Sequence, residues 1–296
     1  MEQSSILNAT TKSSNGWLNG FIGVLLFAGS MPATKMAVKD LDPIFATAAR
    51  AVIAALLALA CVIALREKRP TKEQMWPLIK VAIGGVIGFP LLTAMALEYI
   101  TSAHSLVFMG MLPLSTAIFA VFIGKEKPKP VFWLFSLIGS ALVIGFAFSQ
   151  GVSSNPIGDV LMILAIILCG QSYAEGAKLS KTLGGYQVIS WACIISLPLT
   201  VPIMIYTVPT DLVLVSGESW FGLFYISVVS MFLAYIFWYK GLAQGGIATV
   251  GQIQLLQPLL GMILAATVLN EKVSPTMLYV TFGVILCVAA SKKFAK

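Results

Sequence analysis

The sequence predicts an all-α integral membrane protein in which ten transmembrane helices form two inverted five-helix repeats. Three observations lead to this prediction: the composition, the spacing of apolar runs, and a repeated segment. Of the 296 residues, 58% are hydrophobic and only 10% are charged, and the mean hydropathy is +0.92. A soluble domain carries about 25% charged residues, because its surface must be hydrated. This chain has too little charge for that, so lipid is its expected solvent.

Ten apolar runs are long enough to cross a bilayer, since a hydrocarbon core of about 30 Å needs roughly 20 helical residues. Polar, proline-containing segments such as 66–70 and 153–156 separate them. The polar residues 1–16 are expected to form a cytoplasmic tail, and the first run is interpreted as a span because further runs follow it. The expected spans are 17–38, 43–65, 76–98, 102–123, 131–149, 157–178, 186–206, 219–240, 247–268 and 275–291.

The positive charges predict the orientation, because cytoplasmic loops retain Lys and Arg. With the N-terminus inside, most of these residues fall on the cytoplasmic side, and the opposite side holds only Lys35, Lys39 and Lys272. Both termini are therefore expected in the cytoplasm. The net charge of +7 lies between apolar runs and not on one polar face, so nucleic acid is not an expected partner.

A shift of 145 residues aligns the two halves, placing Pro113 over Pro258 and Glu126 over Glu271. The sequence thus predicts a first five-helix repeat at 17–150 and a second at 155–291. The alternative is a coincidence between two apolar helices. Since each unit has an odd number of spans, consecutive copies insert in opposite directions. Inverted repeats allow alternating access, because two near-equivalent halves can exchange conformations.

Five segments resemble the EamA branch of the drug/metabolite transporter superfamily: 27–35, 42–50, 96–103, 113–126 and 258–271. Segment 27–35 is similar to the first-span pattern that ends in Lys, and segment 96–103 to the junction between spans three and four. The last two match the family's paired helices that run from Pro to Glu.

The chain departs from the family pattern at Ala28, where Trp is common, and at Ala51, where an aromatic residue often follows the Arg. The resemblance implies ten helices and a central cavity lined largely by spans 1, 3, 4, 6, 8 and 9. It also implies a multi-pass protein of a bacterial inner (plasma) membrane that exports amino acids or related metabolites.

Polar groups at membrane depth tend to face the bundle interior or a hydrated cavity. The densest set in this chain is Gln252, Gln254 and Gln257, just before Pro258. Pro258 removes a backbone hydrogen bond and is expected to kink the ninth span. These glutamines are substrate-binding candidates, and the alternative is interhelical contact worth about 0.6 kcal/mol each.

The equivalent fourth span carries the expected kink at Pro113 and the single histidine, His104. His104 is either a proton-coupling group or an ordinary interfacial residue. Tyr99 and Tyr173 are candidates for stacking on the substrate. Most aromatic residues near span ends form interfacial belts. The residues assigned to the belt on this ground are Trp191, Tyr235, Trp238 and Tyr239, and the remaining polar substrate-binding candidates are Ser30, Gln171 and Lys35.

Glu98 and Glu175 are carboxylates inside or at the edge of spans. Each is a candidate for proton coupling, because a membrane carboxylate can have a raised pKa. The alternative is a structural ion pair, between Glu98 and Arg50 or between Glu175 and Lys178. Lys35 is either a snorkelling anchor or an anion contact.

The sequence lacks a phosphate-binding loop, an HExxH motif and a GxSxG motif, and a single histidine does not make a metal cluster. No catalytic residue, metal or cofactor is therefore expected, and the chain is not expected to be an enzyme. The function predicted is a secondary transporter that exports a small amino-acid-like or amphipathic metabolite by alternating access. The first alternative is efflux of cationic drugs, and the second is a membrane sensor or enzyme.

The partners expected are a small-molecule substrate and the lipid bilayer. Protons are one candidate coupling ion, with exchange and facilitated diffusion as the others. Ten helices can enclose a cavity as a monomer, so no second copy is required.

Overall fold

The computed structural model describes residues 2–100, 105, 108–149, 155–257, 259–261, 263–264 and 275–294, and every regular element in these ranges is a helix. This agrees with the all-α part of the predicted fold class. Three shorter apolar helices are Leu112–Phe122, Pro130–Gly145 and Phe282–Ser291. The six helices long and apolar enough to cross a membrane are Asn15–Ala37, Pro43–Ala64, Lys72–Ala96, Pro156–Leu183, Gly185–Tyr206 and Gly217–Gly245.

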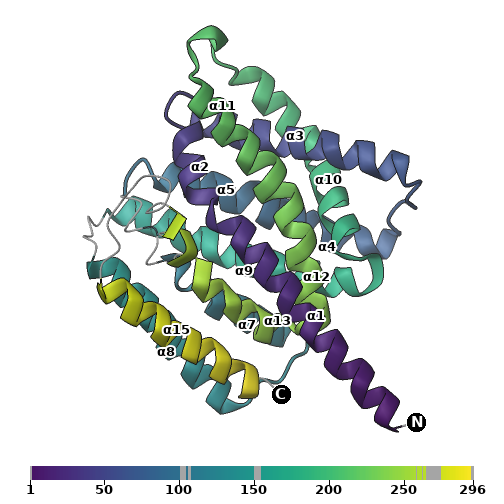
Figure 1. Cartoon of the computed structure of the whole chain (residues 1–296). Coiled ribbons are helices and arrows are strands. Elements are labelled where there is room, and N and C mark those ends of the chain that lie inside the picture. The colour runs from purple at the N-terminus through teal and green to yellow at the C-terminus, as the bar shows by residue number, and fades with distance from the viewer. Residues whose placement is uncertain are drawn as a thin grey trace.

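The chain folds into helices that are broken more often than the sequence suggests (Figure 1). The first half contains α1 (Glu2–Ala28), α2 (Ser30–Ala37), α3 (Pro43–Ala64), α4 (Lys72–Val81), η1 (Ala82–Gly88), α5 (Phe89–Ala96), α7 (Leu112–Phe122) and α8 (Pro130–Ser149). The second half contains α9 (Pro156–Leu183), α10 (Gly185–Tyr206), η2 (Leu212–Leu214), α11 (Gly217–Phe224), η3 (Tyr225–Ala234), α12 (Tyr235–Gly245), α13 (Ile247–Gly251), η4 (Gln252–Leu256) and α15 (Pro275–Phe294).

Local chemistry explains where several helices begin. The Asp42 carboxylate accepts hydrogen bonds from the backbone N–H groups of Ile44 and Phe45, and Pro43 occupies the first turn of α3. Asn155 caps α9 in the same way, again with a proline in the first turn. Side-chain caps satisfy N–H groups that have no partner within the helix. The first turn tolerates proline, because the N–H that proline lacks would have no partner there.

Helices from the two halves pack along each other: α1 with α12, α3 with α10, and α8 with α15. In Figure 1 the two termini lie toward the same lower side of the bundle. Glycines bring α1 and α12 into direct contact, since a Cβ on Gly16 would stand 2.5 Å from the Gly245 backbone nitrogen. A Cβ on Gly241 would stand equally close to the Gly20 nitrogen. Close contacts between small residues are a usual way to pack helices in lipid.

Two helices contain wide, π-type turns at corresponding places in the two halves. These are η1 in the third expected span and η3 in the eighth. The shift of 145 residues moves 82–88 onto 227–233, which lies within η3. Wide turns inside helices are rare and frequently occur at functional sites. The sequence pattern did not predict them.

The first span is not one straight helix, because α1 and α2 meet at Gly29. The Tyr225 hydroxyl donates a 3.0 Å hydrogen bond to the Leu26 carbonyl and fills the corner. A Cβ on Gly29 would stand 2.4 Å from that hydroxyl oxygen, so the corner requires glycine. The fourth span is also interrupted, by a turn at Gly110 and Met111, and α7 restarts with Pro113 in its first turn.

Candidate functional site

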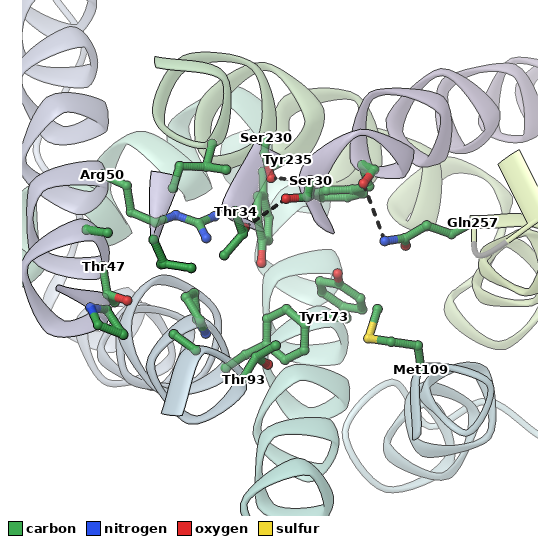
Figure 2. A pocket seen from close by; sticks show the side chains of 18 residues that line it. Ser30, Thr34, Thr47, Arg50, Thr93, Met109, Tyr173, Ser230, Tyr235 and Gln257 are labelled. Atoms are coloured by element: carbon green, nitrogen blue, oxygen red, sulfur yellow. Dashed lines mark hydrogen bonds between the residues drawn. The ribbon is translucent and has the colours of Figure 1, made fainter. Parts of the chain in front are cut away.

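A pocket lies in the middle of the bundle, between the two halves of the chain (Figure 2). It holds about 680 Å³ of empty space, including open solvent at its mouth. The lining residues are Phe27, Ser30, Thr34, Val38, Pro43, Ala46, Thr47, Arg50, Phe89, Pro90, Thr93, Ala94, Met109, Tyr173, Ile226, Ser230, Tyr235 and Gln257.

The polar wall of the pocket joins the two halves. Ser30 Oγ donates a 2.8 Å hydrogen bond to Ser230 Oγ, which connects α2 with η3. One turn along α2, Thr34 Oγ1 donates to the Ser30 carbonyl at 2.7 Å. Thr93 is buried, and its hydroxyl has no hydrogen-bond partner among the described residues. The pocket therefore offers both engaged and free hydroxyl groups to a ligand.

Arg50 is the charged residue among those described at the pocket wall. It comes from α3 and is 9% exposed, and its guanidinium points toward the middle of the pocket (Figure 2). In the described part of the chain no carboxylate pairs with it, and its buried Nε has no acceptor. A buried charge normally has a partner, because an isolated ion in a low-dielectric interior is costly. Within the described part of the chain, this positive charge at the pocket wall is therefore uncompensated.

Aromatic rings form the apolar wall. The Phe27 and Tyr235 rings meet edge to face at 5.1 Å, and Tyr173 lies 6.0 Å from Tyr235. Trp238 packs behind them, 5.3 Å from Tyr173 and fully buried. Ring pairs of this geometry are favourable and hold one another in place. The wall is therefore a fixed surface for an apolar group.

The predicted glutamine cluster lies at one edge of the pocket. Gln257 lines it, and its amide is 3.5 Å from the Phe27 carbonyl, a long contact for a hydrogen bond. Gln254 donates a 3.1 Å bond to the Tyr173 hydroxyl. Gln252 is fully buried, and neither polar atom of its amide has a partner among the described residues. Gln252 and Gln254 belong to η4 (Gln252–Leu256), a tighter 3-10 segment, and Gln257 follows directly after it.

The bundle is packed closed at the end that carries Glu126, here called the Glu126 end. The Glu126 carboxylate accepts hydrogen bonds of 2.7 and 2.8 Å from the backbone N–H groups of Ile247 and Ala248. This ties the chain after α7 to the start of α13. The contact of Gly16 with Gly245 lies at the same end. The pocket residues belong instead to the other half of the bundle, toward Asp40.

A charged pair bridges α4 and α9. Lys80 Nζ lies 2.7 Å from Glu175 Oε1, and the side chains are 33% and 6% exposed. Lys178, three residues further along α9, is exposed. The structure thus pairs Glu175 with Lys80 of the adjacent helix and not with the expected Lys178.

The opposite end of the bundle, here called the Asp40 end, holds a polar contact between α2 and α11. The Ser216 hydroxyl and N–H both donate to Asp40, and Ser219 Oγ lies 2.9 Å from the same carboxylate oxygen. These hydrogen bonds hold the pKa of Asp40 below its usual value. Beside it, Glu218 accepts a 2.9 Å bond from Lys39 and raises the pKa of that ammonium.

The structure gathers four of the predicted substrate-binding and ion-pair residues at the pocket: Ser30, Arg50, Tyr173 and Gln257. Gln254 stands directly behind Tyr173. The cavity includes one more helix than the family resemblance implies, since α3 of the second span contributes Arg50. His104 and Pro258 lie outside the described residues.

Other predicted residues lie away from the pocket. Tyr99, Glu98 and Lys35 are exposed, and Gln171 is half-buried but not part of the lining. The predicted pair of Glu98 with Arg50 is absent from the described part of the chain, since one residue faces outward and the other faces the pocket. Their sequence positions predicted similar depth, which does not determine the direction of a side chain.

Sequence reasoning also missed several pocket residues. Thr34, Thr47, Thr93 and Ser230 are single hydroxyl residues in apolar helices and carry no distinctive motif. The belt assignment was wrong for three aromatics, since Tyr235, Trp238 and Tyr239 are buried in the core. The signal available was the run of aromatic residues directly after η3, but recognising it required knowledge of the wide turn.

The model of the EamA-like transporter family matches this chain twice, over residues 14–148 and 156–291. The chain belongs to the EamA-like transporter family. This transporter is therefore a multi-pass membrane protein of the drug/metabolite transporter superfamily with two family repeats. The identification agrees with the resemblance read from segments 27–35, 113–126 and 258–271.

Relatives of the transporter occur in bacteria and archaea. It is 53% identical to the uncharacterized transporter YdeK of Bacillus subtilis, over 96% of this chain and 99% of the relative. An uncharacterized transporter of Archaeoglobus fulgidus is 26% identical over 84% and 87% of the two chains. A protein of known crystal structure superimposes with a TM-score of 0.77 at 20% identity, covering 95% of this chain and 98% of the other. The last comparison shows a shared fold.

Proposed function

We propose that the protein is a secondary transporter that moves a small amino-acid-like or amphipathic metabolite by alternating access through the central pocket, in the direction of export. The observation that carries this proposal is the position of the pocket, whose wall is built by both family repeats and bridged by the Ser30–Ser230 hydrogen bond. Substrate sites at repeat interfaces near the middle of the membrane are a common design in secondary transporters.

The proposal includes ten spans and an inverted relation between the repeats. The packing supports this relation, because helices five spans apart pair with each other: α3 with α10, α7 with α13, and α8 with α15. The contact of α1 with α12 has its counterpart in the contact of α9 with α4, η1 and α5. The wide turns of η1 and η3 flank the pocket at equivalent positions. Such pairing is what a pseudo-two-fold axis between two copies produces.

The proposed cycle exchanges the state of the two ends. In this conformation the Glu126 end is closed by the glycine contact of α1 with α12 and by the Glu126 hydrogen bonds. With both termini in the cytoplasm of a bacterial inner membrane, as the positive charges predict, the Glu126 end is cytoplasmic and the pocket lies nearer the outside. The inverted repeat then supplies the opposite conformation, with the Asp40 end closed.

Efflux of cationic drugs fits the pocket less well. A desolvated cation requires a counter-charge, and the charged residue described at the wall is Arg50, which has the same sign. The buried carboxylate of Glu175 is already paired with Lys80.

Transport by the purified protein in proteoliposomes tests the proposal. A panel of labelled metabolites is measured with and without an imposed pH gradient, and a gradient-independent rate would exclude obligatory proton coupling. Ala46 lines the pocket on α3, so Ala46→Phe should lower transport by at least about tenfold. Leu56→Phe on the same helix is the matched control, since Leu56 is 57% exposed. Equal transport by both variants would refute the pocket as the path.

Export is tested in cells that are loaded with the substrate identified in liposomes. Cells with the native chain should lose the substrate faster than cells with Ala46→Phe. Faster accumulation in place of loss would reverse the proposed direction.

A further inference from the structure

The charge balance of the buried interior differs from that of a neutral binding site. Lys80 and Glu175 cancel each other, whereas Arg50 has no carboxylate partner in the described ranges. A guanidinium keeps its proton at physiological pH. Among the described residues the pocket wall therefore has a net positive charge, carried by Arg50, which is 9% exposed.

We propose that the pocket selects a small organic monoanion: a carboxylate that carries no ammonium group, with an apolar remainder. This inference rests on the proposed function and narrows its substrate class from amino-acid-like or amphipathic metabolites to amphipathic carboxylates. The carboxylate binds the Arg50 guanidinium, whose fork of N–H donors matches two carboxylate oxygens. The hydroxyl of Thr93 faces the same pocket without a partner and supplies a further donor. The apolar part lies against Phe27 and Tyr235, which meet edge to face.

A zwitterion fits this site less well than an anion. Its ammonium group would lie close to Arg50, and like charges repel strongly where water is excluded. The ammonium group also needs hydrogen-bond acceptors. Serine hydroxyl oxygens can accept such a bond, but the described pocket wall contains no carboxylate to compensate the ammonium charge. An uncharged part of the ligand, by contrast, contacts the aromatic wall without leaving a charge uncompensated. The site therefore discriminates by net charge as well as by size.

Ligand-dependent thermal stabilisation of the purified full chain in detergent tests this inference. The probes are aliphatic and aromatic 2-oxo acids, the amino acids with the same side chains, and the corresponding amides and amino alcohols. We expect at least one 2-oxo acid to bind about tenfold more tightly than its amide and amino alcohol, and several-fold more tightly than its amino acid. If no anion is preferred over its own amide and amino acid, the proposal is wrong.

Arg50→Met and Arg50→Lys separate ligand recognition from a structural role. Arg50→Met removes an unpaired buried charge, so the melting temperature of the empty protein should stay level or rise, whereas the anion preference should be lost. Arg50→Lys should keep the preference for anions with about tenfold weaker binding, because the bidentate contact is lost. A lower melting temperature in Arg50→Met together with an intact anion preference would show that Arg50 is structural and would overturn the proposal.

The outcomes also distinguish this inference from the proposed function. Saturable transport of zwitterions in preference to anions would leave the transporter standing and refute the charge selection. Anion binding at Arg50 with no transport in liposomes would support the charge selection and refute the proposed transport.

Discussion

Lys80 on α4 and Glu175 on α9 form a 2.7 Å ion pair in which the carboxylate is almost fully buried and the ammonium group is a third exposed. This asymmetry predicts unequal effects of the two single substitutions. Lys80→Met leaves a buried carboxylate without a partner and should cost up to about 3 kcal/mol. Glu175→Gln leaves a lysine that can reach water, so its cost should be smaller. Thermal denaturation in detergent measures both.

The double variant Lys80→Met with Glu175→Leu is the control for this pair. It removes both charges and should recover most of the stability lost in Lys80→Met, because no buried charge remains. A double variant as unstable as the single one would contradict a structural ion pair. If the double variant also lost a response to pH gradients that the native chain shows, Glu175 would be a coupling group.

A methyl group at Gly241 should force α1 and α12 apart. The Cβ of Gly241→Ala would stand 2.5 Å from the Gly20 nitrogen and 2.8 Å from its Cα, both backbone atoms that a rotamer change does not move. Overpacking of this kind costs about 1–3 kcal/mol. The expected result is a lower melting temperature and slower transport.

Gly145→Ala is the matched control, since a Cβ there meets no atom within 4 Å. Alanine in place of glycine inside a helix raises the stability by up to about 1 kcal/mol. If Gly241→Ala were as stable as Gly145→Ala, the close contact between α1 and α12 would not exist in the membrane.

The polar contact at the Asp40 end should resist acid. Hydrogen bonds from Ser216 and Ser219 lower the pKa of Asp40, so their stabilisation is complete above the ordinary Asp value of about 3.9 and is lost as pH falls through the lower folded value. Spin labels on Lys35→Cys and Phe221→Cys report the separation of α2 and α11. We expect one narrow distance distribution from pH 8 to about pH 4.

Two substitutions test this prediction. Asp40→Asn should broaden the distance distribution at every pH, because an amide accepts weaker hydrogen bonds than a carboxylate. Lys39→Met should leave it unchanged, since the Lys39–Glu218 pair is exposed and such pairs contribute little. Broadening that begins near neutral pH in the native chain would contradict the assignment to Asp40.

The apolar runs and the repeat were sufficient to predict the helical fold class and the family, because both depend on periodic properties of long segments. The direction in which a side chain points and the local geometry of a helix could not be predicted in that way. Arg50 and Glu98 occupy similar depths in the sequence pattern, yet one faces the pocket and the other is exposed. The break at Gly29 depends on Tyr225 from a distant helix, which no local signal specifies.

The glutamines also show which features the sequence could predict and which it could not. Their polarity in an apolar run identified Gln257 as a pocket residue. It did not predict the tighter turn of η4 (Gln252–Leu256), in which residues three apart are aligned, so the amides of Gln254 and Gln257 lie 3.5 Å apart. The wide turn of η3 contributes Ile226 and Ser230 to the pocket wall, and η1 directly precedes Phe89 of that wall. No residue pattern distinguishes these turns from ordinary apolar helix.

Alternating access to the pocket is tested most directly by a single cysteine at Ser230, in a chain whose four native cysteines are replaced. Ser230 lies in η3 at the wall between the repeats. A membrane-impermeant maleimide is added to right-side-out and to inside-out vesicles, with and without transported substrate. Alternating access predicts labelling from both sides and protection by substrate on each side. Labelling from one side only, unchanged by substrate, would contradict it.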